Sequence, residues 1–476
     1  MVLFNAQVMV LAFGNTYISM LMLTNLTSVE ALAGKARIYI SGVILVLIFS
    51  LLPVCPIKCS KGHRYGALFG AVCVEFVMLL VLGNQYSPLW GYVTLGQQHY
   101  ETQKLLNELD NIAPDSQEAI DAVKLYYRKN IEGFIEKDSD LPEQPNIILI
   151  FTEGLSQHII EDERMIMPNV AEYQKKAISF DQYYNHTFAT YRGLIGQLYS
   201  GYQLNNNDSN ELVSVQSILS DQGYNTFWIN TEPQNEEFTA YQESFGFDEI
   251  IGGVEDVYEY TGAILDKKAY EILFDLAEEQ ENTEEPFFIG IYTFGTHASL
   301  GSPDEKFGDG TDEEINKFYN MDYQFGLFME KFENSSLKDN TIVIFTTDHA
   351  TYQDDSFDIS FPGRERKVIT IDEIPLFIYY NGVDAQVVDA EGRNTLNLAP
   401  TVLDFLDISA ANYFIGTSLF SRMVGSICET TYQETSITYS TANGKVAKME
   451  EAELNHFQGM LESYYKVKEV AASADK

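Results

Sequence analysis

The sequence predicts an α/β domain with a mostly parallel sheet flanked by helices, preceded by N-terminal transmembrane helices. From residue 145 onward, short apolar runs alternate with amphipathic stretches, which is typical of strands that alternate with covering helices. Before that domain, the chain contains long apolar stretches and few charges. Residues 1–100 hold five Lys or Arg and two Asp or Glu, whereas the remainder holds 25 and 67. Residues 1–100 are therefore suited to a lipid bilayer, and the acidic remainder is suited to water.

Three apolar stretches mark the expected membrane region, residues 1–83. Each approaches the ~20 residues that a helix needs to cross the hydrocarbon layer. They cover residues 2–23, 38–54 and 66–82, with approximate ends. The segment between the second and third contains Lys58, Lys61 and Arg64, and a short basic loop indicates the cytoplasmic side. We expect a multi-pass protein of the cell membrane with an extracytoplasmic domain. A cleaved signal peptide is the alternative for the first stretch, which lacks a basic start and a small-residue cleavage site.

Two further segments flank the α/β domain. Residues 84–144 are polar, with helical periodicity over 100–112 and 118–137, and are expected to form a helical stalk. Residues 423–476 contain the Asn443-Gly444 dipeptide, which suits a type I′ turn, so a hairpin and then a helix are expected there. The acidic part has one cysteine, Cys428, and so forms no internal disulfide.

Polar side chains follow three of the predicted strands. Expected strands cover residues 146–151, 225–230, 287–294, 341–347 and 374–380. Glu153 follows the first, His297 the third, and Asp348 and His349 the fourth. Taken singly, these residues suit a helix cap, a solvated loop and an ordinary turn. The carboxyl ends of parallel strands meet at one edge of a sheet, and carboxylates with imidazoles suit a divalent cation. Together they therefore predict a metal site.

A hydroxyl for nucleophilic chemistry is available at Thr190. It precedes a helix-like run, GLIGQLYSG, so it is expected at a helix N-terminus, where free amides and the helix dipole favour a phosphoryl group. Arg192, two residues later, adds positive charge for substrate binding. The alternative is that Thr190 only caps this helix.

The order of these motifs resembles the alkaline phosphatase superfamily, in its sulfatase-like branch of lipoteichoic acid synthases and phosphoglycerol transferases. The resemblance rests on NIILIFTEGLS, ATYRG, YTFGTHAS and TIVIFTTDHA and covers about residues 145–422 as a catalytic domain. It implies that the metal ligands are Glu153, Thr190, Asp348 and His349, that Thr190 is the nucleophile, and that His297 faces the substrate phosphate. Three oxygen ligands and one imidazole suit Mn²⁺, with Mg²⁺ and Zn²⁺ as alternatives.

The resemblance implies transfer of a phosphoglycerol-type head group from a membrane lipid to a glycan or polymer acceptor through a phosphothreonine. Sulfate ester hydrolysis is not expected, because the TYRG motif has no nearby cysteine. Lipoteichoic acid synthases carry a Trp-x-Arg pair where this chain has Glu236 and Phe238. Phosphoethanolamine transfer is therefore an alternative, as are a phosphodiesterase or phosphatase and a non-catalytic scaffold.

The net charge bears on possible partners, and three further residues have an expected structural or binding role. The net charge of −39 argues against nucleic acid as a partner, since an acidic surface repels phosphates. His186 is expected to be structural, with a substrate contact as the alternative. Arg364 and Arg366 are expected in a solvated loop, with phosphate or head-group binding as the alternative.

Overall fold

The chain divides into two units, Met1–Asp110 and Asn111–Lys476, which we describe separately in a computed structural model. From residue 87, the structure describes all residues up to 474 except 110, 205–208, 254–255, 259–260, 284, 299, 365, 367, 369, 423–430 and 434–437. Before residue 87, it describes 2–14, 17–18, 22–23, 36–51, 65–66, 69–70, 73, 76–77 and 80.

The first unit contains three described helices: α1 (Val2–Gly14), α3 (Ala36–Leu51) and α5 (Pro88–Leu109). The first two coincide with parts of the first and second expected membrane spans. Most of the third span, 66–82, lies outside the described residues. Among the described helices, none combines the length and the apolar character needed to cross a bilayer. Several large apolar side chains of α3 are nevertheless exposed, including Val43, Ile44 and Ile48.

The second unit is built on an eight-stranded sheet with the order β4-β3-β5-β1-β6-β7-β2-β8. All pairs are parallel except those that β7 makes with β6 and β2. The strands are β1 (Asn146–Thr152), β2 (Ile178–Asp181), β3 (Asn225–Asn230), β4 (Glu249–Gly252), β5 (Phe287–Thr293), β6 (Thr341–Thr347), β7 (Phe377–Tyr379) and β8 (Gln386–Asp389). The predicted mostly parallel sheet is thus confirmed.

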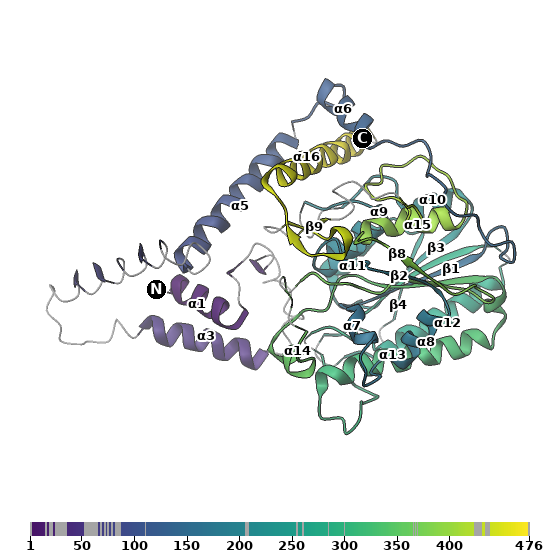
Figure 1. Ribbon diagram of the computed structural model, residues 1–476, viewed down its shortest axis with the longest axis horizontal. Helices are drawn as coiled ribbons and strands as arrows, with labels where there is room; N and C mark the ends of the chain where they lie inside the picture. The colour runs from purple at the N-terminus through teal and green to yellow at the C-terminus, as the bar shows by residue number, and fades with distance from the viewer. Residues whose placement is uncertain are drawn as a thin grey trace. The chain divides into compact units, whose positions relative to one another are not determined.

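Helices cover both faces of this sheet (Figure 1). One face carries α9 (Thr190–Tyr199), α10 (Val215–Asp221), α11 (Glu236–Glu243) and α15 (Leu398–Phe405). The other carries α7 (Gln157–Ile160), α8 (Pro168–Lys175), α12 (Asp266–Glu281), α13 (Glu313–Glu333) and α14 (Asp355–Ser360). Successive side chains of a strand point to opposite faces. Accordingly, Ile147, Leu149 and Phe151 enter one hydrophobic layer, and Ile148 and Ile150 enter the other.

The segments on either side of the sheet differ in part from the expectations. Helix α6 (Gln117–Tyr126) ends well before residue 137, so the predicted helix was too long. After it, the backbone of Arg128 exchanges hydrogen bonds with that of Asn412, and these bonds replace helical ones. Tyr126 of α6 donates to the carbonyl of Met460 in α16 (Glu451–Ala474), at 2.5 Å.

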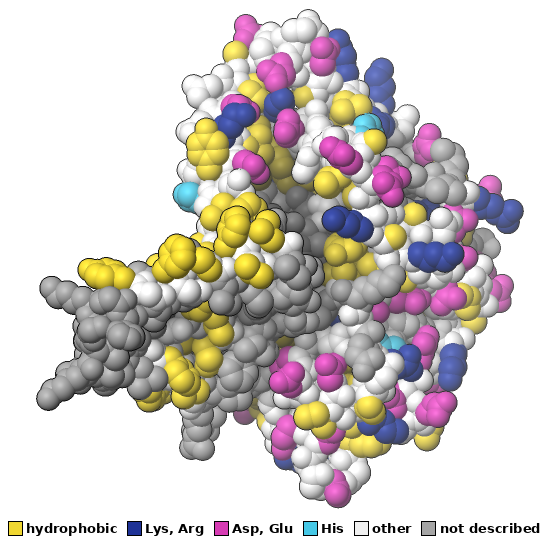
Figure 2. Space-filling view, turned by 60° about the vertical axis from the view of Figure 1, so that its left-hand side comes forward, with side chains coloured by type: hydrophobic (Ala, Val, Ile, Leu, Met, Phe, Trp, Pro, Cys, Tyr) yellow, Lys and Arg dark blue, Asp and Glu magenta, His cyan; other side chains and the backbone are white. Residues whose placement is uncertain are grey.

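The expected C-terminal hairpin and helix are present. β9 (Thr431–Gln433), β10 (Thr438–Ser440) and β11 (Ala447–Lys448) form an antiparallel sheet. Asn443 and Gly444, with φ of 56° and 67°, lie in the turn between β10 and β11, and α16 follows. On the face shown in Figure 2, the acidic side chains are interspersed with Lys and Arg.

Candidate active site

Three predicted ligands converge where β1 and β6 end. These strands are parallel neighbours, and Thr152 is in register with Thr347, so the residues that follow them are adjacent. Glu153, Asp348 and His349 are all buried, and one ligand atom from each lies within 4.8 Å of the other two. The Nε2 atom of His349 is 3.4 Å from Oε1 of Glu153 and 3.4 Å from Oδ2 of Asp348. The topology therefore brings a donor set for a divalent cation together.

Hydrogen bonds from the surrounding backbone orient these side chains. Oδ1 of Asp348 accepts from the amides of Gly154, at 2.8 Å, and His349, at 2.7 Å. Nδ1 of His349 lies 2.8 Å from the carbonyl of Ala350. That carbonyl can only accept, so Nδ1 carries a proton and Nε2 is the nitrogen that faces the carboxylates. Oδ2 of Asp348 is buried and has no hydrogen-bond partner among the described residues, as expected of an atom that ligates a metal.

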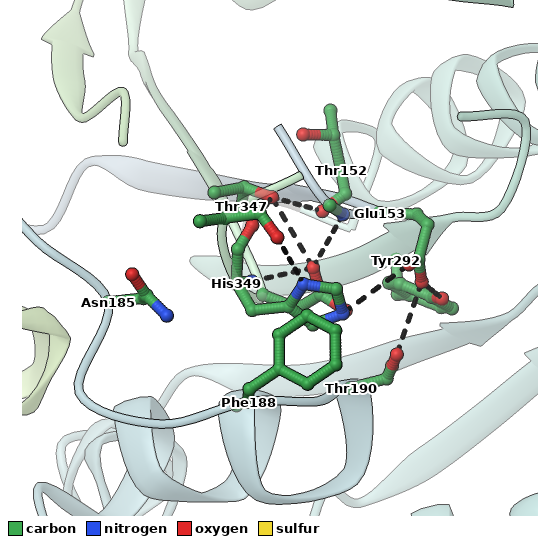
Figure 3. A network of polar contacts seen from close by, with 12 residues as sticks. Thr152, Glu153, Asn185, Phe188, Thr190, Tyr292, Thr347 and His349 are labelled. Atoms are coloured by element: carbon green, nitrogen blue, oxygen red, sulfur yellow. Dashed lines mark hydrogen bonds and ion pairs between the residues drawn. The ribbon is translucent and has the colours of Figure 1, made fainter. Parts of the chain in front are cut away.

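Thr190 lies beside this group and does not cap its own helix. It is the first residue of α9, where Ala189 is the N-cap and makes no side-chain cap. The hydroxyl of Thr190 instead donates to Oε2 of Glu153, at 3.1 Å (Figure 3). Residue Gly193 allows this proximity, because a Cβ there would lie 2.4 Å from the carbonyl oxygen of Asp348. The first turn of α9 thus packs directly on the end of β6.

Further side chains contact the cluster that the sequence did not single out. The hydroxyl of Tyr292, in β5, donates to Oε2 of Glu153, and the hydroxyl of Thr296 donates to the backbone carbonyl of Glu153. The ring of Phe188 packs on that of His349, with centroids 4.3 Å apart (Figure 3). Tyr292 lies within an apolar strand, where nothing in the sequence pattern marks it as polar. Its pairing with Phe151 of the adjacent strand places it near residue 153.

Burial and mutual charge shift the pKa of each group in the cluster. Burial alone would raise the pKa of Glu153, but the charge and hydrogen bond of His349, with His297 and Tyr292, lower it to about 2. Burial and the charge of Glu153 raise the pKa of Asp348 to about 7. Burial opposes the charged form of His349, yet the two carboxylates raise its pKa to about 9. A cation that replaces protons here would relieve the repulsion between carboxylates.

The two predicted substrate-binding residues lie differently. His297 is half-buried beyond β5, its ring stacks on Phe294 with centroids 4.8 Å apart, and its charge acts on Glu153. Arg192 is buried in α9 and donates to the carbonyl of Phe188. The structure therefore places His297 near the cluster, whereas Arg192 binds the loop before Thr190.

Three other residues from the sequence analysis are also placed. His186 is buried, its ring and its amide contact the hydroxyl of Thr395, and burial followed by the charge of Arg192 lowers its pKa to about 3. This environment favours the structural interpretation. Arg364 is exposed. The expectation of a solvated loop is wrong for Arg366, whose side chain is only 7% exposed because it is paired with Asp372.

This fold and site define the class of protein. The sulfatase family model matches residues 145–408, more than half of the chain, and the chain belongs to that family. The predicted relationship to the sulfatase-like branch of the alkaline phosphatase superfamily is thereby confirmed. Members of this superfamily are metal-dependent enzymes of the hydrolase or transferase kind, and the buried acidic and histidine group here can bind a metal. Among curated proteins, none matches this chain in sequence.

Solved structures share the fold at low sequence identity. A protein of the alkaline phosphatase superfamily from Vibrio parahaemolyticus is 19% identical, with a TM-score of 0.57, over 76% of this chain and 96% of that one. The lipoteichoic acid synthase LtaP from Listeria monocytogenes is 16% identical, with a TM-score of 0.56, over 72% and 96%. At these identities the likeness establishes the fold.

Proposed function

We propose that this protein is a membrane-anchored, extracytoplasmic, metal-dependent phosphotransferase. It moves a phosphoglycerol-type head group from a lipid donor to a glycan or polymer acceptor through a phosphothreonine. The observation that carries the proposal is the hydroxyl of Thr190, which lies at a helix N-terminus and donates to Glu153 beside Asp348 and His349. The fold shared with LtaP and the exposed apolar side chains of α3 support the lipid donor and the membrane location.

The donor set fits a divalent cation. Glu153, Asp348, His349 and the hydroxyl of Thr190 would hold it, and Mn²⁺ is the proposed ion. Three buried ligand atoms already lie within 4.8 Å of one another, and Oδ2 of Asp348 has no hydrogen-bond partner among the described residues. When bound, such a cation favours the alkoxide form of a coordinated hydroxyl and stabilises charge on a transferring phosphoryl group.

The side chains of the chain itself supply position and proton transfer. Glu153 accepts the hydrogen bond that aims Thr190. The hydroxyl proton of Thr190 passes to solvent, and the resulting alkoxide, which the second step regenerates, attacks the phosphorus of the lipid head group in line. The phosphorus–oxygen bond to diacylglycerol breaks, and His297 donates a proton to the leaving oxygen. An acceptor hydroxyl, activated by the now neutral His297, then attacks the phosphothreonine and releases Thr190. The free amides of the first turn of α9 stabilise the equatorial oxygens.

A specific observation favours a second candidate, phosphoethanolamine transfer. At the position where lipoteichoic acid synthases carry an arginine, Phe238 is fully buried, and its ring packs at 4.7 Å from that of Tyr191, the residue after the proposed nucleophile. No cation is therefore available from this position to hold glycerol phosphate. Glu236 and Glu237 nearby are exposed, and carboxylates would suit an ammonium group.

Labelled lipids test the proposal directly. The full-length protein in detergent is incubated with head-group-labelled phosphatidylglycerol or phosphatidylethanolamine, with and without Mn²⁺. We expect Mn²⁺-dependent release of diacylglycerol and a phosphorylated peptide containing residue 190. Thr190→Ala should abolish both, and Thr190→Ser should retain part of the activity. The matched control is Thr283→Ala, an exposed threonine at the end of α12.

The outcomes separate the candidate functions. Turnover of phosphatidylethanolamine alone would replace phosphoglycerol by phosphoethanolamine as the transferred group. Release of free head-group phosphate without any acceptor product would indicate a phosphodiesterase. Failure to turn over either lipid, with no phosphothreonine in trapped samples, would overturn the enzymatic proposal and leave the scaffold.

A further inference from the structure

An ion pair outside the ligand set, between a nearly buried arginine and a partly exposed aspartate, contacts the loops of the candidate metal site. The Nε atom of Arg366 is 2.9 Å from Oδ2 of Asp372, and the side chain of Arg366 is 7% exposed. Burying two charges costs several kcal/mol per ion, so such a pair is by itself weak evidence for stability. The role of this ion pair is therefore sought in the other groups that Arg366 and Asp372 contact.

The guanidinium of Arg366 joins two loops that carry the candidate ligands. It donates to the carbonyl of Thr351, at 2.6 Å, and to the hydroxyl of Ser156, at 3.1 Å. Ser156 lies three residues after Glu153, and Thr351 lies two residues after His349. The two loops also bond to each other, because the amide of Ser156 donates to Oγ1 of Thr351, at 3.0 Å, and this hydroxyl donates to the carbonyl of Gly154, at 2.7 Å.

Asp372 extends the connection to the loop before the proposed nucleophile. The amide of Asp372 donates to the side-chain oxygen of Asn185, at 3.1 Å, and Asn185 in turn donates to the carbonyls of Thr187 and Thr370. Nδ1 of His158, in α7, lies 3.2 Å from Oδ2 of Asp372. Burial alone would raise the pKa of Asp372, but the hydrogen bond of His158 and the charge of Arg366 lower it below its ordinary value. The carboxylate is therefore charged at neutral pH.

We infer that Arg366 is a positioning residue, which with Asp372 braces the loops that carry Glu153, His349 and Thr190. A planar guanidinium has five donors in a fixed arrangement, so it can donate to a carbonyl and a hydroxyl at once while its charge faces a carboxylate. A lysine would keep the charge but not this geometry. The brace acts on the ligands through the loops that carry them, because Arg366 donates to the carbonyl of Thr351 and the hydroxyl of Ser156.

The positioning role of Arg366 is tested by the affinity of the protein for Mn²⁺. This measurement rests on the proposed function, which includes the metal site. In the full-length protein, Arg366→Met should raise the dissociation constant for Mn²⁺ about tenfold, the lower end of what changes to residues supporting metal ligands produce. Arg366→Lys should fall between Arg366→Met and the wild type. Asp372→Asn should weaken binding similarly, and the double variant should bind no worse than the weaker single variant, because both remove one brace.

The matched control is Arg364→Met. Arg364 lies in the same loop and is exposed, so its replacement should leave Mn²⁺ binding unchanged. The far-UV circular dichroism spectrum and the metal-free melting temperature establish that each variant is folded. If Arg366→Met does not fold, Arg366→Lys and Asp372→Asn take its place. Folded brace variants that bind Mn²⁺ as tightly as the wild type would overturn the inference, even if their melting temperatures fall.

Hydrogen–deuterium exchange of the metal-free protein tests the brace without the proposed function. Peptides that contain residues 153–156 and 349–352 should exchange faster in Arg366→Met than in the wild type and in Arg364→Met, because their amides lose a common support. Unchanged exchange in both peptides would also overturn the inference. If the wild type binds no Mn²⁺ yet exchange accelerates, the proposed metal site fails while the brace stands.

Discussion

The close contact at Gly193 leads to a quantitative prediction for Gly193→Ala. A Cβ at this position would lie 2.4 Å from the carbonyl oxygen of Asp348, whereas ordinary contacts begin at 3.4 Å. Helix α9 must therefore move away from β6 by about 1 Å, the difference between these distances. Thr190 lies one turn before Gly193 and moves with it. A misplacement of this size at a reacting group can lower the rate about 100-fold.

Stability should fall in the same variant although alanine is the better helix former. Gly→Ala inside a helix gains about 1 kcal/mol, but overpacking a rigid interior costs about 1–3 kcal/mol. We expect a net loss of up to about 2 kcal/mol in the free energy of unfolding, from the difference between these two effects. The matched control is Gly459→Ala in α16, where an added Cβ meets no atom within 4 Å; it should gain stability and keep full activity.

The assay for Gly193→Ala combines lipid turnover, the dissociation constant for Mn²⁺ and thermal unfolding. We expect loss of turnover with weaker Mn²⁺ binding, since Thr190 is a proposed ligand as well as the nucleophile. A variant that gains stability as Gly459→Ala does, and retains both turnover and Mn²⁺ affinity, would refute the reasoning that this contact positions Thr190.

Three further predictions concern pH and hydrogen bonding. Burial raises the pKa of Asp348 to about 7, and the carboxylates raise that of His349 to about 9, so Mn²⁺ must displace protons from both groups. The affinity for Mn²⁺, measured by titration calorimetry, should therefore increase about tenfold per pH unit from pH 7 to 9, and more steeply from pH 6 to 7. Burial raises the pKa of Asp266 to about 7. The folded protein therefore loses stability as pH rises from about 4 to 7, because the unfolded chain releases this proton more readily. Asp266→Asn should accordingly raise the melting temperature more at pH 8 than at pH 5. Tyr292→Phe removes a hydroxyl that donates to Glu153 and should weaken Mn²⁺ binding about tenfold without unfolding the protein.

Each of these predictions has a contrary outcome. Mn²⁺ affinity that is independent of pH would mean that Asp348 and His349 carry no protons to displace. A melting temperature shift for Asp266→Asn that is equal at both pH values would contradict the raised pKa of Asp266. Tight Mn²⁺ binding by Tyr292→Phe would show that Thr190 alone suffices to orient Glu153.

Much of the sheet and the convergence of Glu153, Asp348 and His349 followed from local pattern. Buried parallel strands are nearly continuous apolar runs, and their carboxyl ends share one edge. Polar residues directly after two such runs are therefore placed by topology alone. The short strands β2, β4 and β8 were not predicted, because four residues with two apolar side chains give no such signal; β4 and β8 are the edges of the sheet.

Residues that support the site from a distance in sequence could not be predicted in this way. Tyr292 lies within an apolar strand, and Phe188 in a loop, so their contacts with Glu153 and His349 depend on the packing of β5 and α9 against β1 and β6. Arg366 was expected in solvent, because charged residues near Gly and Pro are usually in exposed loops. Its partner Asp372 is close in sequence, yet only the folded loops show that both face inward.

Because β1 lies between β5 and β6, the residues proposed for the reaction lie at the central strands of the sheet, apart from exposed residues that could affect substrate binding. The residues proposed for the chemistry follow central strands or begin a helix packed directly upon one, where insertions would disrupt both hydrophobic layers. Glu236 and Glu237, at the start of α11, are exposed and lie outside that framework. Substitutions at such exposed positions should consequently change binding of the proposed substrate while sparing the geometry of Glu153, Thr190, Asp348 and His349.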